Sequence, residues 1–409
     1  MTEDKKKFNI TVKSNTKDLY NFMKLVPNRK KRIENASNEP IESDAINTLA
    51  KALHPERQYL IISDIIDETK SAKTFKLVPD PNSITRSLAY FRAGQYLSLK
   101  VNVNGVEITR PYSISSSPSE VLEGFYEITI RKEEQGFLTS HIWDNWKVGT
   151  KVLSSGPEGF FYFEPLRDLK NVIGIAGGSG ITPFRSIAKS IIEGKIDANL
   201  TIFYGSSEED DIIFYEEFNK LMEEYPDKIK IIHILSCEVV SLKGCESGFI
   251  TGDIIEKYCD VKNSTVFICG PQVMYEFVEK ELKRFDVSRK RIRREAFGEI
   301  KDIISYSGYP KELAEKTFRI KVQIGDKIQE IPANATESIL VAMERANLAP
   351  PSKCRSGECG FCRSLLISGN IYISPISDWR KAADKKFNYF HPCYSYPISD
   401  LEINVPRHL

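Results

Sequence analysis

The stretch that decides the fold of the C-terminal part of this chain is Cys354-Arg355-Ser356-Gly357-Glu358-Cys359-Gly360-Phe361-Cys362, and a fourth cysteine, Cys393, follows later. The spacing C-x4-C-x2-C with one remote cysteine is typical of the ligands of a plant-type [2Fe–2S] cluster. The short polar loop can turn tightly and direct backbone N–H groups toward cluster sulfurs. We therefore predict that Cys354, Cys359, Cys362 and Cys393 hold such a cluster.

Two other uses of the four cysteines stay open at this point. Zinc is the first alternative, but structural zinc sites favour paired short knuckles, which the remote Cys393 fits poorly. Disulfides are a weaker alternative. If the cluster is present, a one-electron centre lies at one end of the chain, which implies a source of electrons elsewhere in it.

Length and composition set broad limits. The 409 residues predict two to four domains, and a formal net charge of +1 gives no indication of a nucleic-acid partner. The first seven residues lack the apolar core of a secretory signal, and no stretch approaches the ~20 apolar residues of a membrane span. Four further cysteines are scattered, and free thiols beside a cluster motif favour a reducing cytoplasm. They are Cys237, Cys245, Cys259 and Cys269.

Residues 1–54 are predicted to be an N-terminal extension, partly helical or arm-like. Lys24 and the run Arg29-Lys30-Lys31-Arg32 are interpreted as part of a solvated arm rather than a docking patch. A short helix is expected from Asp44 to Leu53, with Ser43 as its N-cap.

Residues 55–165 alternate polar and apolar positions in short runs that Gly and Pro separate. Tyr59–Ile62, Tyr96–Val101 and Tyr126–Arg131 are expected to be strands. This pattern predicts a small closed antiparallel β-barrel.

Residues 166–299 change to an alternation of strands and helices, which predicts a parallel sheet covered on both faces. Strands are expected at Asn171–Ala176, Leu200–Tyr204, Ile229–Leu235, Thr265–Cys269 and Arg291–Ala296, and helices at Pro183–Glu193, Ile212–Glu224, Asp253–Tyr258 and Pro271–Phe285.

Residues 300–315 are predicted to be a linker, and residues 316–409 a compact α+β domain of the β-grasp type. Strands are expected at Thr317–Ile324 and Lys327–Pro332, with a helix at Glu337–Ala346 before the cysteine loop. The fold class is therefore multidomain: an antiparallel β-barrel, an α/β parallel-sheet domain and an α+β β-grasp domain.

The barrel contains Arg110-Pro111-Tyr112-Ser113-Ile114-Ser115. An arginine can pair with a phosphate, a tyrosine can stack on a flavin ring, and a serine hydroxyl can hydrogen-bond the N5 edge of that ring. A strand and turn with a packed tyrosine explains the motif equally well when it is taken alone.

The α/β domain contains Ala176-Gly177-Gly178-Ser179-Gly180-Ile181-Thr182-Pro183 after an apolar strand. Such a turn can bring backbone close to a pyrophosphate at a helix N-terminus, with Pro183 as first helical residue. It is not the G-x-G-x-x-G fingerprint, which disfavours a simple Rossmann dehydrogenase. Cys269 ends the fourth strand, where ligands bind in parallel sheets; alternatively it is a small buried apolar residue.

Taken together, these motifs resemble the ferredoxin–NADP reductase-like flavoproteins. Over about residues 55–409 the chain is similar to the three-domain, oxygenase-type iron–sulfur flavoprotein reductases that carry a C-terminal plant-type [2Fe–2S] ferredoxin domain. The motifs occur in the order of that family: Arg110 to Ser113, Gly156-Pro157-Glu158-Gly159-Phe160, Gly177 to Pro183, Cys269-Gly270-Pro271 and Glu295-Ala296-Phe297-Gly298.

The resemblance implies roles for individual residues. Ser113, Cys269 and Glu295 are expected at the reacting atoms, and Thr139 takes the place of a usual serine near the flavin phosphate. The residues expected to bind flavin or nicotinamide are Arg110, Pro111, Tyr112, Ser113, Arg131, Gly136, Thr139, Gly177, Gly178, Gly180, Thr182, Ser206, Cys269, Gly270, Pro271 and Phe297.

The function implied is an electron-transfer reductase that takes hydride from NADH to FAD and passes single electrons through the cluster to an acceptor protein. FMN in place of FAD stays open, as do NADPH as donor, a subunit of a larger oxidoreductase and a redox sensor. The acceptor, whether an oxygenase, a ferredoxin or another protein, is not indicated. NADH is favoured because Ser206-Ser207-Glu208-Glu209-Asp210-Asp211 is expected beside the adenine ribose, where carboxylates would repel a 2′-phosphate.

Overall fold

The computed structural model describes residues 16–37, 44–134, 136–236, 242, 244–300, 302–375 and 378–407. The chain divides into two compact units, Met1–Ala50 and Lys51–Leu409. In the first unit, helix α1 (Thr16–Glu34) contains the basic run that the sequence placed in a solvated arm. Helix α2 (Ala45–Leu53) lies within one residue of the predicted range, and the predicted cap Ser43 lies outside the described residues.

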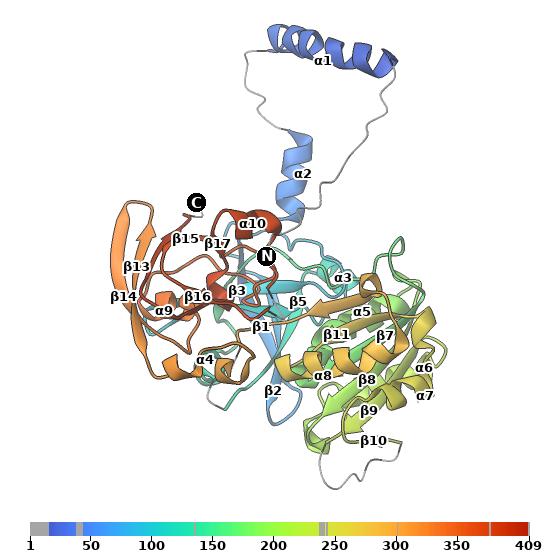
Figure 1. Cartoon of the computed structure of the whole chain (residues 1–409). Helices are drawn as coiled ribbons and strands as arrows, with labels where there is room; N and C mark the ends of the chain where they lie inside the picture. Colours follow the sequence, from blue (N-terminus) through green and yellow to red (C-terminus); the bar gives the residue numbers. More distant parts are fainter. Residues whose placement is uncertain are drawn as a thin grey trace. The chain divides into compact units, whose positions relative to one another are not determined.

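The second unit begins with a six-stranded antiparallel sheet in the order β4-β3-β6-β1-β2-β5 (Figure 1). A bridge between Ile114 and Ile128 joins its two edges, so the sheet curls into the predicted barrel, and α3 (Pro118–Leu122) and α4 (Phe137–Asn145) lie between strands. The strands are β1 (Gln58–Asp67), β2 (Ala72–Pro79), β3 (Tyr96–Val103), β4 (Val106–Ser113), β5 (Tyr126–Arg131) and β6 (Lys151–Ser154).

Polar and apolar residues alternate along β5, a pattern that is common in strands with one face toward solvent. Its polar residues do not face solvent, because five of its six residues are buried. Glu127 forms an ion pair with Arg185 of the next domain at 2.6 Å, and the Thr129 hydroxyl lies 2.7 Å from that of Thr74. The polar face of β5 is therefore an interface between domains.

The next sheet is parallel, with the order β10-β9-β8-β7-β11-β12. Its strands are β7 (Asn171–Gly177), β8 (Asn199–Ser206), β9 (Ile229–Leu235), β10 (Glu246–Ser247), β11 (Thr265–Cys269) and β12 (Ile292–Glu295). Helices α5 (Thr182–Ile192) and α6 (Tyr215–Glu224) share one apolar cluster with the sheet, and α7 (Gly252–Tyr258) and α8 (Gln272–Leu282) share another. Because side chains alternate across strands, the two clusters cover opposite faces, as predicted.

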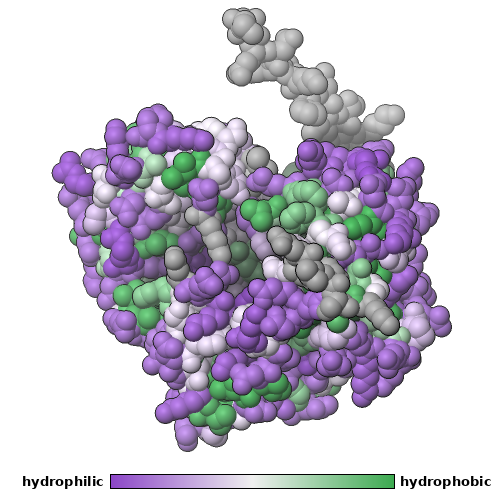
Figure 2. All heavy atoms as spheres, turned by 90° about the horizontal axis from the view of Figure 1, so that it is seen from below, coloured by the Kyte–Doolittle hydropathy of each residue, from purple (hydrophilic) through white to green (hydrophobic). Residues whose placement is uncertain are grey.

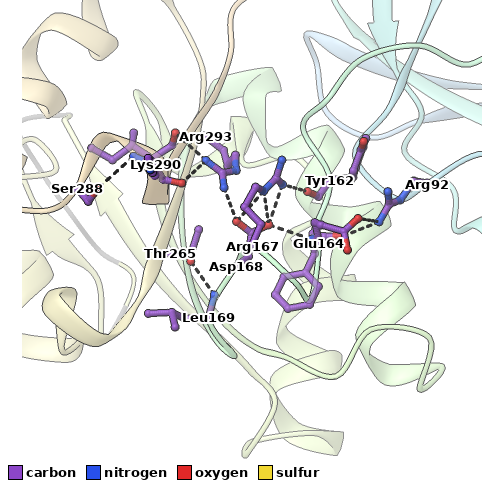
Figure 3. Close-up of polar contacts among 12 residues, drawn as sticks. Arg92, Tyr162, Glu164, Arg167, Asp168, Leu169, Thr265, Ser288, Lys290 and Arg293 are labelled. Atoms are coloured by element: carbon purple, nitrogen blue, oxygen red, sulfur yellow. Dashed lines mark hydrogen bonds and ion pairs between the residues drawn. The ribbon is translucent and has the colours of Figure 1, made fainter. Parts of the chain in front are cut away.

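The segment that connects the barrel to β7 is fastened by a buried carboxylate. Figure 3 shows Arg167 and Arg293 converging on Asp168, whose side chain is fully buried. Arg293 Nη2 donates to Asp168 Oδ1 at 2.7 Å, and Leu169 N donates to Thr265 Oγ1 at 2.9 Å. Arg92 of the barrel pairs with Glu164 in the same segment at 2.9 Å. Barrel and parallel sheet are therefore held together through this connection.

The C-terminal domain has a mixed sheet in the order β14-β13-β19-β15-β17 and a small β16-β18 pair. Helix α9 (Ile339–Arg345) packs on it, and Ser338 caps that helix by accepting from Val341 N at 3.3 Å. The remaining elements are β13 (Thr317–Ile324), β14 (Lys327–Asn334), β15 (Ser364–Ser368), β16 (Ile371–Tyr372), α10 (Ala382–Lys386), β17 (Tyr389–Phe390), β18 (Tyr396–Pro397) and β19 (Leu401–Val405).

The predicted multidomain fold class is thus confirmed, with small differences at element ends. α5 starts one residue before Pro183, which is its second residue rather than its first, because a 3₁₀ turn, Gly178–Ile181, precedes it. α8 ends at Leu282 and passes into a 3₁₀ turn, Lys283–Phe285. Figure 2 shows that polar side chains cover most of one face, with apolar ones in small separate patches.

Candidate functional site

The four cysteines of the predicted cluster site come together as two pairs. Cys359 N donates to Cys354 Sγ at 3.4 Å, and Cys362 Sγ lies 3.4 Å from Cys393 Sγ. Cys393 reaches the loop from the 3₁₀ turn Pro392–Tyr394. The loop bends through left-handed backbone at Gly357 (φ +81°) and Gly360 (φ +70°), where glycine carries little strain.

Two pairs of thiols fit a cluster of two irons better than a single ion. Cys₄ ligation of a [2Fe–2S] centre divides the thiolates between its irons, whereas a structural zinc needs four ligands around one point. Within the described ranges, no group of three or more His, Cys, Asp or Glu side chains is placed around one such point. The donor set therefore fits the predicted cluster.

The ionisation of these thiols depends on their neighbours. Hydrogen bonds from Cys359 and Ser356 lower the pKa of the Cys354 thiol. The adjacent Cys354 raises the pKa of Cys359, and Cys362 raises that of Cys393. Neighbouring thiolates repel each other unless a cation lies between them, so metal binding would favour the ionised form of all of them.

A buried arginine holds the cysteine loop. Arg355 is 1% exposed and adopts left-handed backbone, φ +59°. Its guanidinium donates to Glu344 of α9 at 3.0 Å and forms an ion pair with Glu299, in the segment after β12. Although burial opposes it, these two carboxylates raise the pKa of Arg355. The network fixes the first cysteine of the loop.

A second ion pair joins the loop to the barrel. Lys353 pairs with Glu158, a residue of the Gly156–Phe160 motif, and Lys353 Nζ lies 4.1 Å from the centre of the Phe361 ring. Cys354 therefore has a cation on each side, and each cation is bound by a carboxylate from outside the loop.

The predicted flavin-binding strand is β4. Ser113 is buried, and its Oγ has no hydrogen-bond partner among the described residues. Tyr112 packs against the barrel core, and Pro111 lies opposite Ser98 of β3. Arg110 donates to Thr109 O at 3.0 Å and lies 3.6 Å from Glu344, so it already has a carboxylate partner from the C-terminal domain.

The other predicted flavin residues have local partners. Arg131 Nη2 donates to Asp211 O at 2.8 Å, while its Nε has no partner in the described part of the chain. Gly136 precedes α4, and Thr139 Oγ1 accepts from Glu133 N at 3.1 Å. A Cβ at Gly136 would lie 2.2 Å from Thr139 Oγ1, so this tight turn depends on glycine.

The glycine turn after β7 packs against the end of β11. A Cβ at Gly180 would lie 2.1 Å from Cys269 O, and one at Gly177 would lie 2.8 Å from Pro271 Cδ. Thr182 donates to Ser179 O at 2.9 Å, and Gly178 (φ +52°) lies against the Arg131 guanidinium. These glycines are therefore required because the turn packs closely against the end of β11, and their lack of side chains also leaves the backbone open to a ligand.

Three predicted residues meet at the carboxyl ends of the parallel strands. Cys269 pairs in register with Glu295 of β12, and Gly270 N donates to Tyr275 Oη at 3.1 Å. Burial raises the pKa of both Cys269 and Glu295 well above the ordinary values. Glu295 Oε2 has no hydrogen-bond partner within the described ranges.

A cavity of about 530 Å³ connects this region with the cysteine loop. Its walls come from the barrel, the Gly156–Phe160 motif, β12 and the loop. Phe297 and Tyr96 meet edge to face there, with ring centres 5.4 Å apart. The lining includes Tyr96, Glu158, Glu295, Phe297, Cys354 and Cys359. Among the predicted residues, Glu295, Phe297, Cys354 and Cys359 thus face one space, whereas Arg110, Tyr112, Ser113 and Cys269 are not part of its lining.

The acidic run after β8 has a different environment from the expected one. Lys70 of the β1–β2 turn pairs with Glu208 and Asp210, and Asp211 accepts from Ser71 Oγ at 2.7 Å and pairs with Arg131 at 3.2 Å. The carboxylates are partly neutralised by the barrel, so the argument from repulsion of a 2′-phosphate loses force. Ser206 Oγ is buried and has no hydrogen-bond partner in the part described.

Several residues of the site were not found by sequence reasoning. Tyr96 and Lys353 line the cavity, and Arg355 with Glu299 and Glu344 holds the loop. One signal was available, since Lys353 and Arg355 flank the cluster cysteine Cys354 in the sequence. Their carboxylate partners come from distant segments, which no local pattern reveals.

Three family models match consecutive parts of the chain. An oxidoreductase FAD-binding domain matches residues 62–163, an oxidoreductase NAD-binding domain matches residues 175–280, and a 2Fe-2S iron-sulfur cluster binding domain matches residues 322–397. The predicted cofactors FAD and [2Fe–2S] and the nicotinamide substrate NADH are thereby supported. The buried partnerless atoms of Ser113, Ser206 and Glu295 fit a site that binds polar molecules.

Similar proteins share this organisation. The ferredoxin reductase component of 3-ketosteroid-9-alpha-monooxygenase from Mycobacterium tuberculosis is 28% identical, over 83% of this chain and 93% of its own length. The glycine betaine monooxygenase reductase subunit of Chromohalobacter salexigens is 24% identical, over 83% and 93%. The structure of phthalate dioxygenase reductase superposes with a TM-score of 0.62 at 23% identity, covering 86% of this chain and 98% of that one, which shows the shared fold.

The three domains follow one another in the order that the resemblance implied, and they account for most of the chain. The chain is a ferredoxin–NADP reductase-like iron–sulfur flavoprotein reductase with a C-terminal 2Fe-2S domain.

Proposed function

We propose that this protein is the reductase component of an oxygenase system, which takes electrons from NADH and delivers them singly to an oxygenase protein. One observation carries the proposal: Glu295, Phe297, Cys354 and Cys359 line the same cavity. The relatives named above as reductase components of monooxygenases support an oxygenase as acceptor. With such an acceptor we place the protein in the cytoplasm. Among the described helices, none is long and apolar enough to cross a membrane.

We assign the work to domains with the limits expected from the sequence. Residues 55–165 would bind the flavin, 166–299 the nicotinamide nucleotide and 316–409 the cluster, joined by the linker 300–315, with 1–54 as an extension. When bound, the flavin accepts a hydride as an electron pair and releases electrons one at a time, which connects a two-electron donor to a one-electron centre.

Residues of β4 and of the crevice at the ends of β7, β11 and β12 would orient the flavin and nicotinamide rings. Ser113 Oγ is free to donate to a ring nitrogen, Tyr112 and Phe297 offer aromatic faces, and burial raises the pKa of Glu295, which favours its protonated form. Cys269 and Gly180 would set the depth of the nicotinamide, since the backbones of β11 and the glycine turn touch there. Arg110, Arg131 and Thr139 would hold the phosphate end, with the arginines exchanging their present carboxylate partners for phosphate.

The ion pairs of the cysteine loop would set the path to the cluster. Glu158 belongs to the barrel and Lys353 to the loop, so their pairing keeps Cys354 close to the cavity. Tyr96 and Phe297 line the cavity beside this pair and meet edge to face, and their apolar rings would limit water there.

The test is a comparison of electron acceptors with the purified holoenzyme. Ferricyanide accepts electrons from flavin directly, whereas an oxygenase protein should be reduced only through the cluster. We expect NADH to support both, and a protein captured from the source cells by pull-down to be an oxygenase that NADH reduces in the presence of this reductase. Reduction of ferricyanide without reduction of any captured oxygenase would contradict the proposed acceptor.

A further inference from the structure

Helix α1 has an apolar face that is interrupted by Lys30 and that none of the described residues covers. Leu19, Phe22, Met23, Val26 and Ile33 follow the spacing i, i+3, i+4, i+7, i+14, which places them on one side of a helix with 3.6 residues per turn. Each of the five is between 60% and 75% exposed, and α1 contains no buried residue.

Among the described residues of its unit, none packs on α1 closely enough to bury one of its side chains. Isolated helices of this length are marginal in water, and most helices in proteins are stabilised by burial of an apolar face. Pro27 lies inside α1 and removes one backbone hydrogen bond, which weakens it further. A surface that covers the apolar face would therefore stabilise α1.

The charge of α1 indicates what that surface is. Six basic side chains against two acidic ones give α1 a net charge of +4, whereas the whole chain has +1. Lys17, Lys24 and Lys31 repeat every seven residues on the side opposite the apolar face, Arg29 flanks that face, and Lys30 lies within it. Lysine and arginine in such positions can extend toward an interface while their stems stay on the apolar side.

Helix α2 repeats the apolar part of this pattern. Ile46, Leu49 and Leu53 share one side of the helix and are exposed. A groove on a protein accommodates the face of one helix, whereas a planar surface can receive both helices. Basic charge around an apolar face is typical of helices that lie in the interface of an anionic membrane.

We propose that α1 binds the surface of an anionic lipid bilayer, with its apolar face among the acyl chains and its basic side chains at the headgroups. The helix lies on the membrane and does not cross it. The second unit, Lys51–Leu409, keeps its own fold and site while residues 16–34 attach it to the surface. This inference concerns residues outside the three catalytic domains and does not depend on the proposed acceptor.

The test is sedimentation of the full-length holoenzyme with lipid vesicles. One vesicle population contains phosphatidylcholine alone, and the other contains phosphatidylcholine with phosphatidylglycerol. We expect binding to the anionic vesicles that high salt weakens, little binding to the neutral ones, and a gain of helical signal in circular dichroism on binding.

Two matched variants separate apolar burial from charge. Phe22→Glu with Val26→Glu places two carboxylates on the apolar face, and Asn21→Glu with Asn28→Glu makes the same change of charge on the basic face. We expect the first variant to bind about tenfold or more weaker than the second. NADH oxidation with ferricyanide should be equal in both, which shows that the second unit is folded.

Three outcomes would overturn the proposal. Absence of binding to anionic vesicles at low salt would exclude the membrane. Equal weakening by both variants would mean that charge alone acts and the apolar face is not inserted. Light scattering that shows a dimer, lost in the Phe22→Glu and Val26→Glu variant while vesicles bind nothing, would assign the apolar face to a second copy of this chain.

Discussion

The cysteine loop and the crevice at the ends of β7, β11 and β12 are built in opposite ways. The loop supplies three of the four thiols within residues 354–362, and its thiols already pair with one another. The crevice takes Cys269 from β11 and Glu295 from the neighbouring β12, and Glu295 Oε2 has no hydrogen-bond partner among the described residues. The difference teaches that the loop is complete within the chain, whereas the crevice needs its bound molecules to satisfy it.

The largest effect should come from breaking the loop. Cys359→Ser removes one thiol of the Cys354 pair, so we expect the iron and the EPR signal of the reduced cluster to be lost. Reduction of a one-electron acceptor protein should fall by about 100-fold or more, while NADH-to-ferricyanide activity in the crevice is kept. Cys259→Ser, at a cysteine far from the loop, should change neither, and loss of ferricyanide activity in Cys359→Ser would show that the two regions are not separable.

The next largest effect concerns the buried support of the loop. Arg355→Met removes the buried cation that Glu299 and Glu344 share and leaves Glu344 only Arg110, at 3.6 Å. Breaking a buried ion pair costs about 3–5 kcal/mol of stability. Arg345→Met is the matched control, because Arg345 is on α9 but pairs with Glu337 while 46% exposed, and such a pair contributes about 1 kcal/mol or less. Thermal unfolding followed by cluster absorbance measures both. An equal loss of stability in both variants would mean that the buried ion pairs of Arg355 contribute no more than the exposed pair of Arg345.

The third effect is a pH dependence of activity that arises from Glu295 in the crevice. Burial raises the pKa of Glu295, so its contribution to stability is present at low pH and declines as pH rises toward the folded pKa. If the neutral acid orients nicotinamide, kcat/KM for NADH with ferricyanide should fall about tenfold per pH unit above that pKa. Glu295→Gln should retain activity and lose this alkaline decline, whereas Glu279→Gln, at a partly buried pair with Arg294, should keep it. A Glu295→Gln profile that matches the original protein would exclude this role.

The smallest effect is expected where the two regions meet. Lys353→Ala breaks the partly exposed pair with Glu158, which should cost about 1 kcal/mol or less in stability. Electron delivery through the cluster should slow severalfold because the loop is less firmly placed, while hydride transfer stays unchanged. Stopped-flow absorbance resolves the two steps. Lys100→Ala, which breaks the pair with Glu107, is the control, and an equal slowing in both variants would remove the special role of Lys353.

The sequence predicts best what short-range patterns determine. The cysteine spacing indicates the cluster, and the apolar runs of β7, β8, β9 and β11 give the parallel sheet, because buried parallel strands are continuous apolar segments. The order of the motifs likewise gives the order of the domains.

What the sequence did not predict depends on contacts between distant segments. The polar residues of β5 indicate solvent until Arg185 is seen beside Glu127. The ion pairs of Glu208, Asp210 and Asp211 with Lys70 and Arg131 likewise join distant segments. In α1 the apolar residues are interspersed with basic ones, so their common face becomes evident only with the bounds of the helix.

The contact between the β1–β2 turn and the acidic run after β8 has a consequence for protein engineering. Lys70, Ser71 and Arg131 belong to one domain, and their carboxylate partners belong to the next. A chimaera that takes its nucleotide domain from a relative would separate these partners even if every catalytic residue were retained. A domain exchange in this chain should therefore move the barrel and the α/β domain together. The smallest segment that can be exchanged without breaking these contacts is larger than either domain.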